Sequence, residues 1–357
     1  MSDRPHARAV KQAFRAKRAD QPNPNPYLPP YRRAVAPKLQ AGFELQGFRL
    51  IERLGKGHSA QVWKAVVIDP DHPVQTLSLR QPVAIKFYEG DRSRTSLVRR
   101  DREYQVASGL DHPNVVKVHE LMLSGARPFH DFLVMEYVTG RTLKAMIPSD
   151  GMDALRVIEI GTQLLSGLTE IHANGALHRD IKPANVIVQE KPSYGPAPHY
   201  IPKLLDLGIV HVMDNLSPAL TGSSFLGSTH YSSYEQLTGT GIDERSDVYS
   251  FGALMFHCLT GKAMYDGMPA PAISVQMTTE PLFIKPGNMG SGASTKRELI
   301  RFVNHCLAKD PASRPSSAAS ALRDLEEIKA KAWERAQEEA MVALRYGRYD
   351  GHSLPRG

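Results

Sequence analysis

Apolar and polar residues alternate along three short runs in the first quarter of the chain, which is the pattern of β-strands with one buried face. The runs cover residues 48–54, 61–66 and 82–88. A polar insertion with Asp-Pro and His-Pro turn signals separates the second run from the third. A helical stretch is expected next, over about residues 96–110. The pattern therefore predicts a small sheet accompanied by one main helix.

The apolar period lengthens beyond Gly140 to about 3.6 residues, which is typical of amphipathic helices. Four long helices are expected, over residues 152–173, 244–261, 296–308 and 316–344. A strand-rich N-terminal part followed by a larger helical part indicates an α+β arrangement of two lobes. The length of 357 residues accommodates two such lobes with tails at both ends.

The first 41 residues differ in composition from the rest of the chain, since they are basic and then proline-rich. Nine lysines and arginines oppose two aspartates in residues 1–40, which accounts for the whole formal net charge of +7. Such a segment buries too little apolar surface to offset the entropy of ordering, so we expect a disordered or extended tail over 1–41. It is either a solvated tail or a docking arm for an acidic partner, phospholipid or nucleic acid. The remaining body is formally neutral, so the interpretation as a nucleic-acid-binding protein rests on this tail alone, and nucleic acid is not the expected partner.

Cysteine usage and hydropathy bear on the compartment. Cys258 and Cys306 lie in apolar helical contexts and show no metal-ligand spacing, so we expect buried free thiols in a reducing compartment. No apolar stretch reaches the length of a membrane span, and no hydrophobic segment follows the charged N-terminus. These features predict a cytoplasmic protein without a membrane span.

The candidate chemistry centres on the segment His-Arg-Asp-Ile-Lys-Pro-Ala-Asn at residues 178–185. Transfer of a phosphoryl group needs a carboxylate that orients the incoming hydroxyl, a cation near the moving phosphate, and a neutral oxygen ligand for magnesium. Asp180, Lys182 and Asn185 supply these three groups within one short loop. Asp206 follows an apolar strand and precedes a Leu-Gly pair, so it is either a turn residue or a second hard oxygen ligand for Mg²⁺.

Two features upstream also suit a phosphate ligand. Glycines at 55 and 57 lie between two predicted strands, where they would let backbone N–H groups approach phosphates, although a plain tight hairpin also needs glycine. Lys86 lies on an apolar strand, where it either reaches the surface or holds a phosphate. In the second case a carboxylate must fix its ammonium group.

Together these motifs resemble those of the eukaryotic-type (Hanks-type) serine/threonine protein kinases, and the run Asp-His-Pro-Asn-Val-Val at 111–116 is similar to bacterial members. The resemblance covers about residues 48–325. It implies an α+β, two-lobed protein-kinase-like fold with a small antiparallel-sheet N-lobe, one main helix and a larger helical C-lobe. The implied boundaries are a kinase domain over 42–325, its N-lobe at about 42–135 and its C-lobe at about 139–325, and a C-terminal helical extension and tail over 326–357.

The resemblance also implies roles for individual residues. The implied catalytic residues are Asp180, Lys182, Lys86 and its partner Glu103, with Asp101 as the nearest competitor of Glu103. Asn185 and Asp206 are the implied metal ligands. The implied nucleotide-binding residues, among which Met135 is the gatekeeper, are Leu54, Gly55, Lys56, Gly57, His58, Ser59, Ala60, Val62, Ala84, Lys86, Met135, Glu136, Val138 and Ile187. The cofactors that follow are ATP and Mg²⁺, with Mn²⁺ as an alternative metal.

Structural positions follow from the same resemblance. Asp247 would hold the catalytic loop, and Arg314 would pair with Glu235. This glutamate ends the run Ser233-Tyr234-Glu235, where the family usually has Ala-Pro-Glu, and the departure bears on peptide docking more than on catalysis. The stretch around residues 191–198 is longer than the family norm and is expected to be a hairpin-loop insertion.

The implied function is ATP-dependent phosphorylation of serine or threonine hydroxyls in protein substrates, to which Lys182 and Ser228 both point. Arg179 beside the catalytic aspartate suggests control by a phosphate on a nearby hydroxyl, so autophosphorylation is expected on Thr221, Ser223 or Ser224. A pseudokinase scaffold is one alternative, although every catalytic position carries a reactive residue. A small-molecule kinase is the other, although such enzymes usually have His-Gly-Asp in this loop. The last helix either packs on the large lobe, is solvated, or contacts a partner.

Overall fold

The computed structural model describes residues 38–57, 60–88, 101, 104–122, 131–191, 199–206, 229–280, 282–284 and 294–345. The chain divides into two compact units, and every helix and strand below belongs to the unit formed by Leu39–Leu123 and His130–Gly357. The predicted tail at 1–41 falls almost wholly outside the described residues. Of the helix expected at 96–110, residues 101 and 104–110 are described; residues 101 and 104–107 are helical, whereas 108–110 are not.

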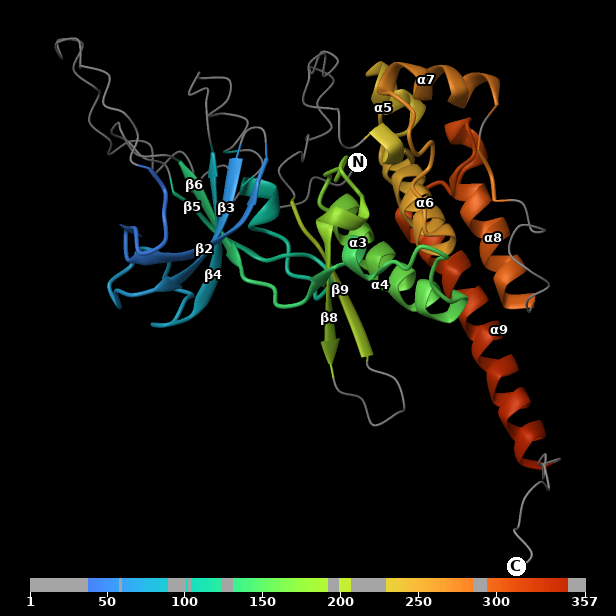
Figure 1. Cartoon of the computed structure of the whole chain (residues 1–357), viewed down its shortest axis with the longest axis horizontal. Coiled ribbons are helices and arrows are strands. Elements are labelled where there is room, and N and C mark those ends of the chain that lie inside the picture. Colours follow the sequence, from blue (N-terminus) through green and yellow to red (C-terminus); the bar gives the residue numbers. More distant parts are fainter. Residues whose placement is uncertain are drawn as a thin grey trace, which may run out of the picture. The chain divides into compact units, whose positions relative to one another are not determined.

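Six strands form an antiparallel sheet in the order β1-β2-β3-β4-β6-β5 (Figure 1). The three alternating runs of the sequence are its strands β2, β3 and β4, which confirms the period-two prediction. The strands are β1 (Glu44–Leu45), β2 (Phe48–Lys56), β3 (Ala60–Val67), β4 (Pro82–Tyr88), β5 (Val118–Met122) and β6 (Phe132–Glu136).

Strand β4 separates two groups of side chains, because successive residues of a strand point to opposite faces. Val83, Ile85 and Phe87 enter a hydrophobic core that the strands of this sheet form together with Val74 and Leu77 of the β3–β4 connection. Ala84, between them, belongs to the larger core cluster that continues into the helical part. Lys86 shares the face of Ala84 and therefore points away from the sheet's own core.

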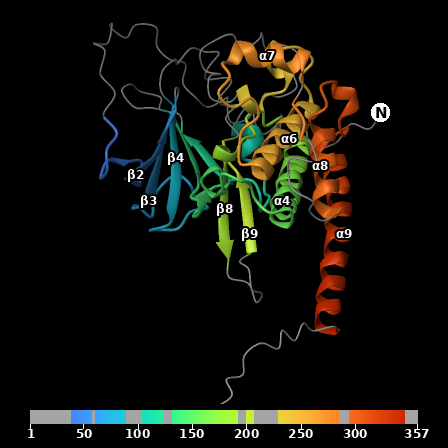
Figure 2. The same ribbon diagram turned by 45° about the vertical axis from the view of Figure 1, so that its right-hand side comes forward.

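The four predicted long helices are all present, and their ends differ from the expected ones by at most a few residues. They are α4 (Ala154–Ala173), α6 (Glu244–Thr260), α8 (Ser294–Cys306) and α9 (Ala318–Arg345). Helix α4 packs against α6 and α9, and α8 packs against α6 and α9 (Figures 1 and 2). Aspartate side chains cap two of these helices, since Asp153 accepts from the N–H of Arg156 and Asp243 from that of Arg245. The predicted boundary at 325 lies inside α9, which continues unbroken to Arg345.

Three shorter helices were not predicted from the sequence. They are α3 (Leu143–Met146), α5 (Tyr234–Thr238) and α7 (Ala270–Thr279). The first two are too short to show a 3.6-residue period. Helix α7 has no charged residue and no clear polar face, so its sequence lacks the contrast that reveals an amphipathic helix.

A second, three-stranded sheet consists of β7 (Arg141–Thr142), which precedes the catalytic-loop segment, and of β8 (Val186–Lys191) and β9 (His199–Leu204), which follow it. Strands β8 and β9 pair antiparallel as far as Lys191 and His199, which confirms the expected hairpin, while the connecting residues 192–198 lie outside the described residues. Backbone hydrogen bonds of 2.9 and 2.8 Å from Val116 N to Leu204 O and from Leu204 N to Asn114 O join this hairpin to the segment before β5.

Both cysteines are free and buried, as predicted. Burial raises the pKa of Cys258 to about 12 and that of Cys306 further, so both thiols stay protonated and unreactive at neutral pH. In the described part of the chain, no helix combines the length and the hydrophobicity that crossing a bilayer requires.

Candidate active site

A cavity of about 310 Å³ lies between the N-terminal sheet and the segment that leads from the catalytic loop to Asp206. This volume is within the range of pockets that bind small molecules, and the walls are mostly apolar with a few polar groups among them. Its lining residues are Leu54, Gly55, Val62, Ala84, Lys86, Val116, Met135, Glu136, Tyr137, Val138, Thr142, Ala184, Asn185, Ile187, Leu205 and Asp206.

Most of the expected nucleotide-binding residues and both expected metal ligands line this one cavity. Lys56, Gly57 and Ala60 lie at the turn between β2 and β3 and are not among the lining residues, and His58 and Ser59 lie outside the described residues. Five further lining residues were not predicted from the sequence: Val116, Tyr137, Thr142, Ala184 and Leu205. Tyr137, Ala184 and Leu205 directly flank predicted site residues, so proximity in sequence was the available signal.

The strand register explains how one wall of the cavity forms. Val62 on β3 pairs with Lys86 on β4, and Ala84 on β4 pairs with Met135 on β6. Because paired residues share a face of the sheet, these four side chains point to the same side. The alternation that buries Ile85 in the sheet's own core thus also directs Lys86 into the cavity.

Lys86 forms an ion pair with Asp206, which lies 120 residues further along the chain. The lysine side chain is 13% exposed and the aspartate side chain 45%. The Lys86 ammonium lowers the pKa of the Asp206 carboxyl group more than burial raises it, so this group is anionic at neutral pH. Glu103, the expected partner of Lys86, lies outside the described residues, and its pairing stays a prediction.

Within the catalytic loop, Lys182 and Asn185 both contact Asp180. Lys182 Nζ donates to Asp180 Oδ1 and Oδ2 at 2.9 and 2.7 Å. Asn185 Nδ2 donates to Asp180 Oδ2 at 2.8 Å and to the Asp180 carbonyl oxygen at 3.0 Å. The loop thereby fixes the Asp180 carboxylate from two sides. Asn185 uses its amide nitrogen for this contact, and its amide oxygen is the atom that could bind a cation.

Asp247 on α6 holds the backbone just before Asp180. Its carboxylate accepts the N–H groups of His178 and Arg179, both at 2.8 Å, and lies 2.9 Å from His172 Nε2. Burial raises the pKa of Asp247, but the contact with His172 and the neighbouring groups outweigh burial, so the pKa lies below its usual value. Arg179 has a φ of 60°, a left-handed conformation that non-glycine residues seldom adopt. The predicted structural role of Asp247 is confirmed.

Asn185 and Asp206 fit a magnesium site by their chemistry and position. Both line the same cavity, and amide and carboxylate oxygens are hard ligands that Mg²⁺ prefers. Proteins often bind Mg²⁺ through one or two side chains, while substrate phosphates and water complete the coordination, so two such ligands are enough. Among the described residues no group of three or more His, Cys, Asp or Glu side chains could hold a metal ion.

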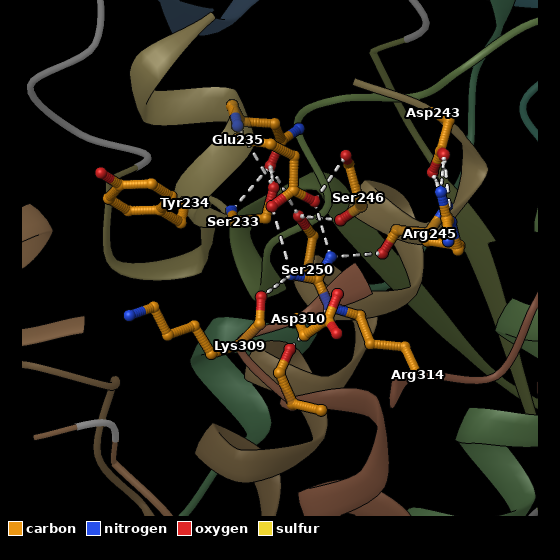
Figure 3. A network of polar contacts seen from close by, with 12 residues as sticks. Ser233, Tyr234, Glu235, Asp243, Arg245, Ser246, Ser250, Lys309, Asp310 and Arg314 are labelled. Carbon is orange, nitrogen blue, oxygen red and sulfur yellow. Dashed lines mark hydrogen bonds and ion pairs between the residues drawn. The ribbon is translucent and has the colours of Figure 1, made fainter. Parts of the chain in front are cut away.

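A buried ion pair lies behind the loop and joins Glu235 to Arg314 (Figure 3). Arg314 Nη1 and Nη2 donate to the two carboxylate oxygens at 2.6 and 3.1 Å, and the Ser246 hydroxyl donates to Oε1 at 2.8 Å. Burial raises the pKa of Glu235, but these hydrogen bonds and the charge of Arg314 lower it further than burial raises it. The predicted pair is confirmed.

The unusual run Ser233-Tyr234-Glu235 forms the start of helix α5. Ser233 is the N-cap, and a capping box links it to Gln236: the Ser233 hydroxyl accepts the Gln236 N–H at 3.3 Å, and Gln236 Oε1 accepts the Ser233 N–H at 2.9 Å. Tyr234 occupies the first helical position, where proline is favoured but not required. The cap therefore preserves the helix start, and with it the position of Glu235.

The Glu235–Arg314 pair predicts an acid-sensitive stability. The folded-state pKa of Glu235 lies below the ordinary value of 4.5, so its stabilising effect is present above that pH and is lost as the pH falls below 4.5 through the folded-state pKa. Urea unfolding of the wild-type protein between about pH 5 and pH 3 should show the free energy of unfolding falling with pH. In Glu235→Gln the slope should be smaller by up to about 1.4 kcal/mol per pH unit, the limit for one proton.

A matched control is Glu327→Gln, because Glu327 pairs with Lys331 on the exposed surface of α9. This substitution should leave the slope unchanged, since exposed pairs contribute little. Equal slopes for the wild type and Glu235→Gln would contradict the prediction.

A family model and several curated relatives each match most of this chain. The model of the protein kinase domain family matches residues 48–333. A probable serine/threonine-protein kinase of Clostridium perfringens is 32% identical over 285 residues, which cover 79% of this chain and 38% of the relative. Serine/threonine-protein kinase pkn3 of Myxococcus xanthus is 30% identical over 79% of this chain and 50% of its own length. Serine/threonine-protein kinase PknB of Mycobacterium leprae is 32% identical over 71% of this chain and 40% of its own length. The chain thus spans half or less of the length of these relatives.

Proposed function

The chain belongs to the protein kinase family, and from this premise we propose that it transfers the γ-phosphoryl group of ATP to serine or threonine hydroxyls of proteins. The observation that carries the proposal is the convergence of Lys86, Asn185 and Asp206 on one cavity, beside the loop that positions Asp180 and Lys182. The names of the relatives, serine/threonine-protein kinases, support the choice of acceptor.

Each polar residue has a distinct task in this proposal. Asp180 accepts or orients the proton of the incoming hydroxyl, and Lys182 stabilises the charge on the group in transfer. Lys86 holds the nucleotide phosphates from the sheet side of the cavity. Asn185 and Asp206 would hold Mg²⁺, which when bound neutralises phosphate charge and aligns the phosphates. Most of the rate enhancement then comes from positioning and electrostatics.

The apolar walls of the cavity suit the adenine base. Val62 and Ala84 from the sheet and Ile187 from β8 would pack on the two faces of the ring. Met135 ends the apolar part of β6, and the backbone of Glu136 and Val138 beyond it would bind the edge of the base. The Glu136 side chain accepts from Lys203 Nζ on β9 at 2.8 Å, which ties this connecting segment to the second sheet.

Autophosphorylation is the finer part of the proposal. Thr221, Ser223 and Ser224 precede the described segment that begins at residue 229, and they lie outside the described residues themselves. Arg179 stands directly before Asp180 in the chain, and a phosphate on one of these hydroxyls would pair with its guanidinium group.

Intact-mass analysis after incubation with ATP and Mg²⁺ tests this step. The wild-type protein is expected to gain at least one phosphoryl group, which peptide mapping places on Thr221, Ser223 or Ser224, whereas Asp180→Asn should gain none. A wild-type enzyme that phosphorylates a protein substrate at full rate and never gains phosphate would rule out autophosphorylation and leave the transferase proposal intact.

A further inference from the structure

Gln236 on α5 links the catalytic loop to two helices through a single buried amide group. The residue is 7% exposed. Oε1 accepts the N–H of Ser233 at 2.9 Å and the hydroxyl of Ser250, on α6, at 3.2 Å. Nε2 donates to the carbonyl oxygen of Arg179 at 3.3 Å. The amide oxygen thus accepts from the start of α5 and from α6, and the amide nitrogen donates to the catalytic loop.

The peptide unit between Arg179 and Asp180 is held at both of its polar atoms. Gln236 Nε2 donates to the Arg179 carbonyl oxygen, and the Asp180 N–H donates to His178 Nδ1 at 3.3 Å. Because a peptide unit is planar, holding the oxygen and the nitrogen fixes the orientation of the whole plane. That plane determines where the Cα–Cβ bond of Asp180 starts, and hence where the carboxylate lies.

This peptide unit needs such support because the residue before it is strained. Arg179 has a φ of 60°, and a non-glycine residue in this region costs energy that the surroundings must offset. Asp247 holds the N–H of Arg179 at 2.8 Å, on the N-terminal side of the strained φ. Gln236 holds the carbonyl on the other side. The strained residue is therefore clamped at its two ends by different helices, α6 and α5.

A capping role alone does not account for the amide. A capping box needs only an acceptor at this position, and glutamate serves as well as glutamine. A glutamate here would supply the same acceptor for Ser233, but as a carboxylate it would place a second acceptor against the Arg179 carbonyl oxygen. The contact with Arg179 is the one that requires an N–H donor.

We propose that Gln236 is a positioning residue for phosphoryl transfer, which acts by holding the peptide unit between Arg179 and Asp180 in the orientation that aims the Asp180 carboxylate. This inference rests on the proposed function. It predicts that the nitrogen of the side-chain amide matters for the rate of transfer, while the oxygen matters for the start of α5.

The test compares Gln236→Glu with Ser250→Ala, using steady-state transfer to a protein substrate and thermal unfolding. Gln236→Glu keeps the acceptor for Ser233 and loses the donor to Arg179, so kcat, measured well below the melting temperature, should fall about ten-fold or more at an unchanged KM for ATP. The buried carboxylate against the Arg179 carbonyl oxygen should also lower the melting temperature. Ser250→Ala removes a donor to the same amide oxygen and leaves the contact with Arg179 in place, so kcat should stay within about two-fold of wild type.

The outcomes separate the two proposals. A wild-type protein that transfers no phosphate would count against the proposed function itself. An active wild type with an equally active Gln236→Glu would overturn the positioning role only. Parallel losses of kcat and melting temperature in both variants would also overturn it, because they would show a purely structural residue.

If Gln236→Glu does not fold, Gln236→Met takes its place, since it has a similar length and no N–H donor. The same loss of kcat at an unchanged KM for ATP is expected. A failure of both variants to fold would assign Gln236 to the fold alone and would overturn the proposal.

Discussion

Replacing Asp180 by asparagine is expected to lower kcat for phosphoryl transfer by about 10²–10⁴-fold, the usual contribution of a positioned general base. The substitution keeps the shape of the side chain and its contact with Asn185, which needs only an oxygen acceptor at 2.8 Å. It removes the charge that Lys182 contacts through both carboxylate oxygens and the group that receives the hydroxyl proton. Fold and nucleotide affinity should therefore remain close to those of the wild type.

The measurement is the initial rate of transfer to a serine-containing protein substrate, together with the affinity for Mg²⁺-ADP by calorimetry. Asp153→Asn is the matched control. It makes the same chemical change at the N-cap of α4, where asparagine caps equally well. Wild-type turnover that persists in Asp180→Asn would contradict the assigned role. Nucleotide binding without turnover in the wild type would instead favour a pseudokinase scaffold.

Replacing Arg314 by methionine is expected to lower the free energy of unfolding by about 3–5 kcal/mol, the cost of breaking a buried ion pair by removing one partner. The Arg314 side chain has no exposed surface. Its Nε donates to Ala308 O at 2.7 Å, Nη1 to Arg245 O at 3.0 Å and Nη2 to Lys309 O at 2.9 Å, in addition to the two bonds to Glu235. Methionine fills much of the volume but leaves the carboxylate and three carbonyl oxygens without these donors.

Chemical denaturation of the wild type and Arg314→Met measures this loss. Arg335→Met is the matched control, because Arg335 also binds a carboxylate, that of Glu298, through both terminal nitrogens, but at a partly exposed position on α9. Its loss should be much smaller, since water replaces the exposed pair. Equal losses in the two variants would contradict the expectation that the buried Glu235–Arg314 pair contributes more to stability than the partly exposed Glu298–Arg335 pair.

Local patterns in the sequence were sufficient for most of the secondary structure. Alternation identified β2, β3 and β4 because one face of each meets a core, and the 3.6-residue period identified α4, α6, α8 and α9. Helix α7 escaped because it carries no charged face, and α3 and α5 because they are too short. The capping box that starts α5 was readable as Ser-x-x-Gln, so this helix start had a sequence signal that was not used.

The site was only partly accessible to local reasoning. The spacing of Asp180, Lys182 and Asn185 places them in one loop, and their mutual contacts follow from that short separation. The contact between Lys86 and Asp206 cannot be predicted from a local sequence pattern, because 120 residues separate them. It forms only when the N-terminal sheet packs next to the β8–β9 hairpin. The resemblance to a known family supplied that link. The contact between Gln236 and the Arg179 carbonyl is visible only in the folded structure, because no sequence pattern marks which buried amide meets which carbonyl.

The most direct test of the claim that Lys86, Asp180, Asn185 and Asp206 form one nucleotide site is transfer of radiolabelled γ-phosphate from ATP to a generic basic protein by the wild type and by Lys86→Met. The matched control is Lys64→Met, which changes a lysine of the neighbouring strand β3 that pairs with Glu52 and does not line the cavity. The wild type and Lys64→Met should transfer label, and Lys86→Met should transfer little or none. Equal labelling by the wild type and Lys86→Met, or no labelling by the wild type, would contradict the claim.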